Sequence, residues 1–150
     1  MFFCPSTVRE GLGSWKILLY LKKAFIPFSF YTISASQNNN KLDVKETNSL
    51  GATNIYVVTI EDGNYSIATL LTEIKTQMEA NTTFSYTYTI SYNENTSKVS
   101  FLIATGTNIT KTELLFSTGA NKSDSLLRVL GFSEADKEFT NSITLKSDYV

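Results

Sequence analysis

Apolar and polar positions alternate most regularly over residues 84–92, the stretch FSYTYTISY. Every second position there is aromatic or isoleucine, and the positions between are serine or threonine. This period of two predicts a strand with one apolar face. The polar stretch NENTSK (93–98) predicts a tight turn, and VSFLIAT (99–105) predicts the returning strand. The pattern therefore indicates an antiparallel hairpin near the middle of the chain.

A different period runs through GNYSIATLLTEIKTQMEAN, residues 63–81. Its apolar residues recur at the spacing of one helix face, and they are Ile67, Leu70, Leu71, Ile74 and Met78. Either Ser66 or Asn64 can serve as the N-cap. The spacing predicts a helix over about 66–80 that covers one face or end of a sheet.

A second short helix is predicted over about 124–130, within SDSLLRVLGF. Gly131 stands where a helix commonly ends in a left-handed residue, and Phe132 can fold back onto Leu127. Both predicted helices interrupt a chain that otherwise reads as strands.

The remaining strand signals are short and separated by polar Asn, Ser and Thr turns. An apolar, aromatic stretch over 16–33 contains Pro27, which predicts either two strand segments meeting at a bend or an edge strand. The other signals are a half-exposed strand over 41–47, a buried strand over 54–60, a strand over 112–118 and an alternating stretch over 141–150. The pattern predicts a mainly β protein, an antiparallel β-sandwich of jelly-roll-like topology with two covering helices.

Length and composition fit one domain. The chain has 150 residues, with 42% hydrophobic and 13% aromatic residues, which excludes a disordered chain. We expect a loose N-terminal arm over 1–15 and a single β-rich domain over 16–150. The net charge of −1 provides no field that would attract nucleic acid. The apolar run WKILLYLKKAF is too short for a membrane span, which needs about 20 residues.

The residue types exclude several kinds of site. Histidine is absent and Cys4 is the single cysteine, so no zinc site of the Cys/His type and no Ser-His or Cys-His nucleophile pair can form. The carboxylates are scattered and lie in or near predicted turns; examples are Asp43, Glu46, Glu61 and Asp62. The sequence therefore predicts no catalytic, cofactor or metal site, and a protein that is not an enzyme.

Four segments in a fixed order carry a resemblance to a known group of proteins. They are AFIPFSFYTISASQNNNKL, GNYSIATLLTEI, YTISYNENTSKVSFLI and SLLRVLGF. In this order the chain resembles the penton and minor capsid proteins of large eukaryotic DNA viruses, virophages and related mobile elements, over residues 24–150. Members of that group continue beyond the equivalent of residue 150, which leaves open whether the domain is complete at its C-terminus.

The resemblance implies a non-enzymatic shell protein of the virion, made in the host cytoplasm, without a cofactor or a membrane span. Its expected partners are other capsid subunits, either copies of itself or the major capsid protein. Strand edges left unpaired in one subunit can be completed by a neighbour. We expect such a contact at residues 143–150 or at 16–33.

An alternative function is a host-attachment module, a β-sandwich that binds carbohydrate or protein. The tyrosine stripe of the central hairpin, Tyr86, Tyr88 and Tyr92, would form its contact platform if it were exposed. The opposite interpretation places these rings on the inner face of the sheet with their hydroxyls at the rim. Exposure of the tyrosines distinguishes the two.

Overall fold

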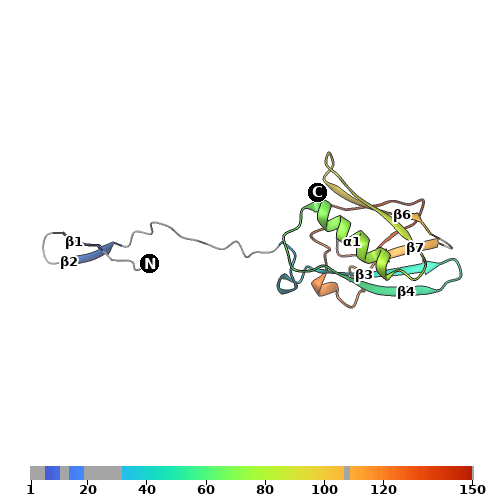
Figure 1. The fold of residues 1–150 in the computed structure, drawn as a ribbon, viewed down its shortest axis with the longest axis horizontal. Coiled ribbons are helices and arrows are strands. Elements are labelled where there is room, and N and C mark those ends of the chain that lie inside the picture. The colour runs from blue at the N-terminus through green and yellow to red at the C-terminus, as the bar shows by residue number, and fades with distance from the viewer. Residues whose placement is uncertain (1–5, 11–13, 19–31, 107–108, 150) are drawn as a thin grey trace.

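The structure, a computed structural model, describes residues 6–10, 14–18, 32–106 and 109–149 (Figure 1). Strands β1 (Ser6–Glu10) and β2 (Ser14–Leu18) pair antiparallel as a separate two-stranded sheet. β1 and the start of β2 fall within the arm that the sequence predicts over 1–15. The predicted bend at Pro27 lies outside the described residues.

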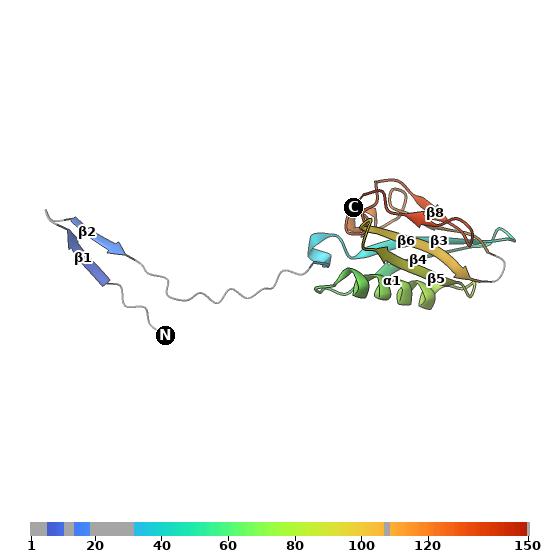
Figure 2. The same cartoon turned by 90° about the horizontal axis from the view of Figure 1, so that it is seen from above.

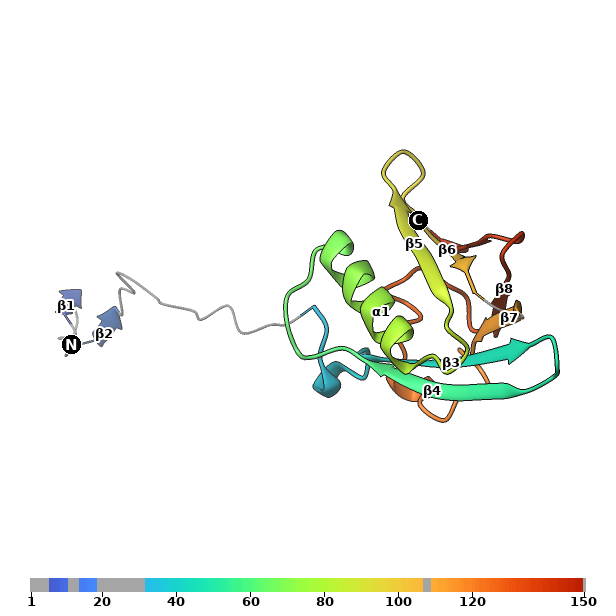
Figure 3. The same ribbon diagram turned by 45° about the vertical axis from the view of Figure 1, so that its right-hand side comes forward.

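The larger part of the fold is built on two antiparallel sheets. The four-stranded sheet has the order β4-β3-β7-β8 and the three-stranded sheet the order β5-β6-β9. The bounds in the first are β3 (Lys41–Asn48), β4 (Thr53–Thr59), β7 (Ile109–Leu114) and β8 (Lys137–Phe139). The bounds in the second are β5 (Thr87–Asn93), β6 (Lys98–Thr105) and β9 (Leu145–Lys146). Figure 3 shows the β5–β6 hairpin crossing the β3–β4 hairpin at a steep angle.

The two sheets enclose one apolar core. Phe139 on β8 meets Tyr88 on β5 edge to face, with ring centroids 6.0 Å apart, and it meets Phe101 on β6 at 5.7 Å. All three side chains are fully buried. The antiparallel β-sandwich is therefore confirmed, and the jelly-roll-like strand order stays a prediction.

The predicted helix over 66–80 is confirmed as α1 (Ile67–Asn81). Ser66 is the N-cap, and its hydroxyl accepts a hydrogen bond from the Thr69 backbone N–H at 3.2 Å. The buried face of the helix consists of Leu70, Leu71, Ile74 and Met78. The helix contacts β5 and β4, and it runs along one side of the strands in Figure 2.

The second predicted helix, over 124–130, is wrong. A short 3₁₀ helix, η2 (Lys122–Asp124), is followed by turns, because Ser125 forms a bridge with Lys41 and the Leu126 N–H donates to the Lys41 carbonyl at 2.8 Å. This pairing with the start of β3 leaves room for a single helical turn, closed by the bond from the Leu130 N–H to the Leu126 carbonyl.

The end of that turn was nevertheless correctly predicted. Gly131 has a left-handed φ of +75°. The Phe132 N–H donates to the Leu127 carbonyl at 3.0 Å, the long-range bond of the Schellman motif. Glycine at this position thus reverses the chain without the cost that a side chain would bring.

The exposure of β3 and β4 is the reverse of what the sequence predicts. The strand over 41–47 is not half-exposed: β3 lies between β4 and β7, and Val44 and Glu46 on it are fully buried. The strand over 54–60 is not buried: β4 is an edge strand, and Ile55 and Val57 are exposed. β-branched content identifies a strand, but it does not tell a central strand from an edge.

The strand signals after residue 110 are only partly confirmed. β7 ends at Leu114, short of the 118 that the pattern predicts, and β8 carries no recognisable period in its three residues. In the last alternating stretch only β9, two residues long, pairs with the sheet. Ile143 and Tyr149, in the same stretch, are exposed.

Candidate functional site

The buried carboxylate of Glu46 is the most unusual polar group in the interior. Its oxygens accept hydrogen bonds from the Tyr56 hydroxyl at 2.9 Å, the Thr82 hydroxyl at 2.7 Å and the Asn54 side-chain amide at 3.2 Å. The Tyr88 hydroxyl is a further donor. These donors replace the water that the carboxylate loses on burial. They come from β4, β5 and the C-cap of α1, so the network joins both sheets and the helix.

This network also changes the acidity of its two phenols. Burial is the largest cause that raises the pKa of Tyr56 above its ordinary value, and the nearby Tyr88 and Glu46 raise it further. Burial likewise raises the pKa of Tyr88, and its hydrogen bond to Glu46 adds to the effect. Both phenols therefore stay protonated at neutral pH. Because Glu46 and Tyr88 are fully buried, the network acts as an internal polar joint between elements.

The tyrosine stripe lies on the inner face of its sheet. Tyr86 and Tyr88 are buried, and the Tyr86 hydroxyl donates to the Thr47 carbonyl at 3.1 Å. Tyr92, at the end of β5, is the exposed member of the stripe, at 36%. This burial contradicts the tyrosine contact platform. The Tyr88 hydroxyl does not lie at a rim either, since it reaches the buried Glu46.

The four carboxylates singled out in the sequence are not brought together. Asp43 lies on β3, where it accepts hydrogen bonds from the Asn121 backbone N–H at 2.6 Å and side-chain amide at 2.8 Å. Asp62 accepts from the Ala35 N–H at 2.8 Å. Glu61 lies in the turn beside it. Asp43 and Glu46 occupy a central strand, contrary to the expectation that they lie near turns. No group of three or more metal-binding side chains occurs among the described residues.

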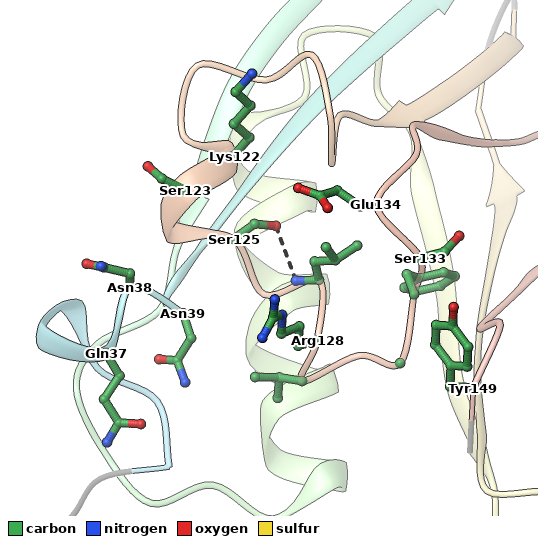
Figure 4. A pocket seen from close by; sticks show the side chains of 14 residues that line it. Gln37, Asn38, Asn39, Lys122, Ser123, Ser125, Arg128, Ser133, Glu134 and Tyr149 are labelled. Carbon is green, nitrogen blue, oxygen red and sulfur yellow. Dashed lines mark hydrogen bonds between the residues drawn. The ribbon is translucent and has the colours of Figure 1, made fainter.

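An open pocket of about 740 Å³ lies beside the turn that ends at Gly131 (Figure 4). Its lining comes from three segments: residues 37–39, residues 122–134 and Tyr149. Figure 4 shows Arg128 between the amide side chains on one side and Tyr149 with Ser133 on the other. The chain end is held here by the Tyr149 N–H, which donates to the Gly131 carbonyl at 2.8 Å.

The lining of this pocket is polar and mixed in charge. Arg128 and Lys122 bring positive charge and Glu134 brings negative charge, and all three are exposed. Amide and hydroxyl groups make up much of the remaining polar lining. The hydroxyl of Ser133, one of the lining residues, donates to the Asp148 carboxylate at 2.8 Å. In the sequence, the one feature that pointed to this region was the predicted helix end at Gly131. Residues 37–39 and 122–134 come together only in the fold, so local sequence did not predict the pocket.

Five of the seven exposed large apolar side chains among the described residues belong to two segments. The first is the β3–β4 hairpin, with Leu50 at 83%, Ile55 at 64% and Val57 at 40% exposure. The second is the C-terminal segment, with Ile143 at 58% and Tyr149 at 61%. The two belong to different sheets, the first to β4 and the second to residues that flank β9. Segment 143–150, predicted as a subunit contact, thus carries exposed apolar groups.

No helix in the described part of the chain is long and apolar enough to cross a membrane. Comparison with known protein families finds no family that matches the chain, and comparison with curated proteins finds no matching relative.

Proposed function

We propose that the protein is a structural component of a viral capsid, a penton or minor capsid protein that assembles with neighbouring subunits in the virion shell. Its partners are other copies of itself, the major capsid protein, or both. The observation that carries the proposal is the presence of two separate exposed apolar surfaces, one at the β3–β4 hairpin and one at Ile143 and Tyr149. A subunit in a closed ring or shell contacts neighbours on more than one side, so it needs at least two such surfaces.

Three further features support this function. The resemblance of residues 24–150 to penton and minor capsid proteins gives the class of assembly. The antiparallel sandwich provides strand edges that neighbours can extend. The polar interior around Glu46 ties both sheets and α1 into one body, which suits a part that must hold its shape under contact.

The proposal is tested by the mass of the purified full chain. Size-exclusion chromatography with light scattering over rising concentration is expected to give a closed oligomer, and negative-stain electron microscopy is expected to give rings or shell fragments. A monomer at every concentration would contradict a self-assembling vertex protein. If a purified major capsid protein also failed to bind the chain, that result would contradict the shell function as a whole.

The C-terminal surface has its own matched variants. Ile143→Ser with Tyr149→Ser removes two exposed apolar side chains and keeps the backbone bond from Tyr149 to Gly131. This variant is expected to fold normally and to assemble less. Tyr92→Ser is the control, because Tyr92 is an exposed aromatic residue, at 36%, on β5 and outside both surfaces. If the two variants assembled equally well, Ile143 and Tyr149 would not be part of the subunit contact.

The second candidate function is a carbohydrate- or protein-binding module, and the open polar pocket favours it. Amides at 37–39 and Arg128 could hold hydroxyl or carboxylate groups of a glycan. Glycan-array binding that disappears in Arg128→Ala, while assembly is unchanged, would support this function. Absence of any glycan binding by the wild-type chain would reject it.

A further inference from the structure

Within the described residues, β4 is the long sheet edge that has no helix packed along it. The two larger sheets have four edges, formed by β4, β8, β5 and β9. β8 has three residues and β9 has two, while β4 has seven. The edge of β5 lies beside α1, and at one end of it the Glu79 carboxylate accepts a hydrogen bond from the Tyr88 backbone N–H at 2.9 Å.

The backbone of β4 offers unpaired groups in a regular row. At the two ends of the β3–β4 pair, the Ile60 N–H donates to Asn40 and the Asn48 N–H donates to Ala52. Hydrogen-bonded and non-hydrogen-bonded residue pairs alternate in an antiparallel ladder. Counting in steps of two from either end shows that the N–H and C=O groups of residue 56 point toward β3. The N–H and C=O groups of residues 55 and 57 therefore point away from β3. Within the described chain no other hydrogen bond engages them.

The side chains of β4 do nothing to protect this edge. Natural edge strands are usually blunted by lysine, proline, bulges or short length. The sequence of β4, TNIYVVT, contains no charge and no proline, and its register with β3 is unbroken. Ile55 and Val57 present apolar side chains on its outer face. Such an edge is a template for another strand.

The two charged side chains of β3 that flank Ile55 and Val57 are already engaged within the subunit. Lys45, the β3 neighbour of Ile55, forms an ion pair with Glu113 at 3.1 Å. Asp43, the neighbour of Val57, is held by Asn121. A second copy approaching this edge therefore meets charged side chains that already have a partner, an ion pair for Lys45 and two hydrogen bonds for Asp43.

We propose that β4 pairs with β4 of a second copy, antiparallel, about a two-fold axis that passes at Tyr56 and stands perpendicular to the sheet. In this register Ile55 of one copy lies opposite Val57 of the other, and each pair exchanges backbone hydrogen bonds. The two Ile55 and two Val57 side chains then form one apolar cluster on the outer face. The two four-stranded sheets become one continuous sheet. A second copy is the favoured partner because its β4 brings the same uncharged strand and the same exposed Ile55 and Val57, so the two edges are complementary to each other.

The β4 contact is one of the subunit contacts of the proposed shell, so this inference rests on the proposed function. A charge-exchange experiment tests the contact separately. One full-length variant carries Ile55→Lys and Val57→Lys, and a second carries Ile55→Glu and Val57→Glu. Alone, each variant places like charges opposite each other across the axis. Mixed, the two variants place lysine opposite glutamate at both positions.

Analytical ultracentrifugation and native mass spectrometry give the readout. We expect wild-type chains to associate through this contact. Each variant alone is expected to associate at least about 100-fold more weakly than wild type, and the mixture is expected to recover one-to-one association. The matched control, Thr72→Lys with Thr76→Lys, adds the same charge on the exposed face of α1 and is expected to associate like wild type. Circular dichroism and thermal unfolding establish that each variant is folded.

The outcomes separate the two proposals. Rings or shells that form equally well with both charged variants would overturn the β4 contact and leave the shell function standing. A wild-type chain that stops at a dimer, sensitive to these charges, would support the β4 contact and contradict a shell built by self-assembly. A wild-type chain that stays monomeric, as when its own N-terminal residues cover β4, would overturn the contact.

Discussion

The Tyr88 hydroxyl on the three-stranded sheet donates a hydrogen bond to the Glu46 carboxylate on the four-stranded sheet, and both side chains are fully buried. Thr82, at the C-cap of α1, donates to the same carboxylate at 2.7 Å. A single carboxylate thus fixes the distance between the sheets and the end of the helix. Hydrogen bonds depend on direction, so this contact specifies how the layers pack more strictly than apolar contacts do.

Removing the Tyr88 hydroxyl tests the strength of that joint. Tyr88→Phe keeps the ring and leaves the carboxylate with one donor fewer, and hydrogen bonds to charged groups contribute about 1.5–3 kcal/mol. We expect the free energy of unfolding to fall by about that amount in urea denaturation. Tyr92→Phe, on the exposed end of the same strand, is the control and is expected to change it by under about 0.5 kcal/mol. Equal effects would show that Glu46 does not depend on Tyr88.

Alkaline titration tests the burial of the phenols. The pKa values of Tyr56 and Tyr88 are raised from 10.0, so folding favours the neutral phenols. Their stabilising contribution is fully present below pH 10 and is lost as the pH rises above it. After a jump to high pH, we expect tyrosinate absorbance to rise in a fast phase from exposed tyrosines and in a slow phase that follows unfolding. Tyr56→Phe should reduce the slow amplitude, and a single fast phase for all eight tyrosines would refute the burial.

Gly131 and Gly51 offer a matched pair for separating backbone strain from packing. Both have a left-handed φ, +75° and +78°. A Cβ at Gly131 would lie 3.0 Å from the Tyr149 carbonyl oxygen, whereas a Cβ at Gly51 would meet nothing within 4 Å. Gly51→Ala is expected to cost about 1 kcal/mol in unfolding free energy, and Gly131→Ala is expected to cost more. Equal costs would mean that the C-terminal segment moves aside without loss.

Periodicity predicted the elements in which local and tertiary preferences agree. The β5–β6 hairpin alternates because one face of it is core, although β5 begins at Thr87 and not at the predicted residue 84. α1 carries an apolar stripe because one face of it is core. In both, the pattern along the chain records burial directly. The predicted helix over 124–130 failed because the backbone of Ser125 and Leu126 pairs with Lys41, which is distant in sequence.

The candidate site was harder to predict than the fold. Glu46 lies in KLDVKET, which reads as a half-exposed strand, and nothing local shows that its oxygens meet donors from Tyr56, Thr82 and Tyr88. The open edge was missed for a related reason. Four apolar or aromatic residues in succession at 55–58 hide which side of β4 faces solvent, and strand order decides it.

Acid titration tests how the end of the chain is held. Asp148 accepts hydrogen bonds from the Ser133 backbone N–H at 2.7 Å and hydroxyl at 2.8 Å, and it forms an ion pair with Lys137 at 2.9 Å. The Ser133 backbone N–H is the largest cause that lowers its pKa, from an ordinary value of 3.8 to about 2. Because the folded state lowers this pKa, the stabilisation is present above about pH 4 and is lost as the pH falls toward 2.

Asp148→Asn removes that contribution, so the variant is expected to be less stable than wild type at pH 7. The difference in unfolding free energy should shrink between about pH 4 and pH 2, since the wild-type carboxylate becomes protonated there. Urea denaturation at several pH values measures it. Glu94→Gln, on the exposed turn between β5 and β6, is the control for loss of one exposed carboxylate, and its unfolding free energy at pH 7 is expected to be close to that of wild type. A difference that stays constant down to pH 2 would mean that Asp148 stabilises the chain end through its shape and not through its charge.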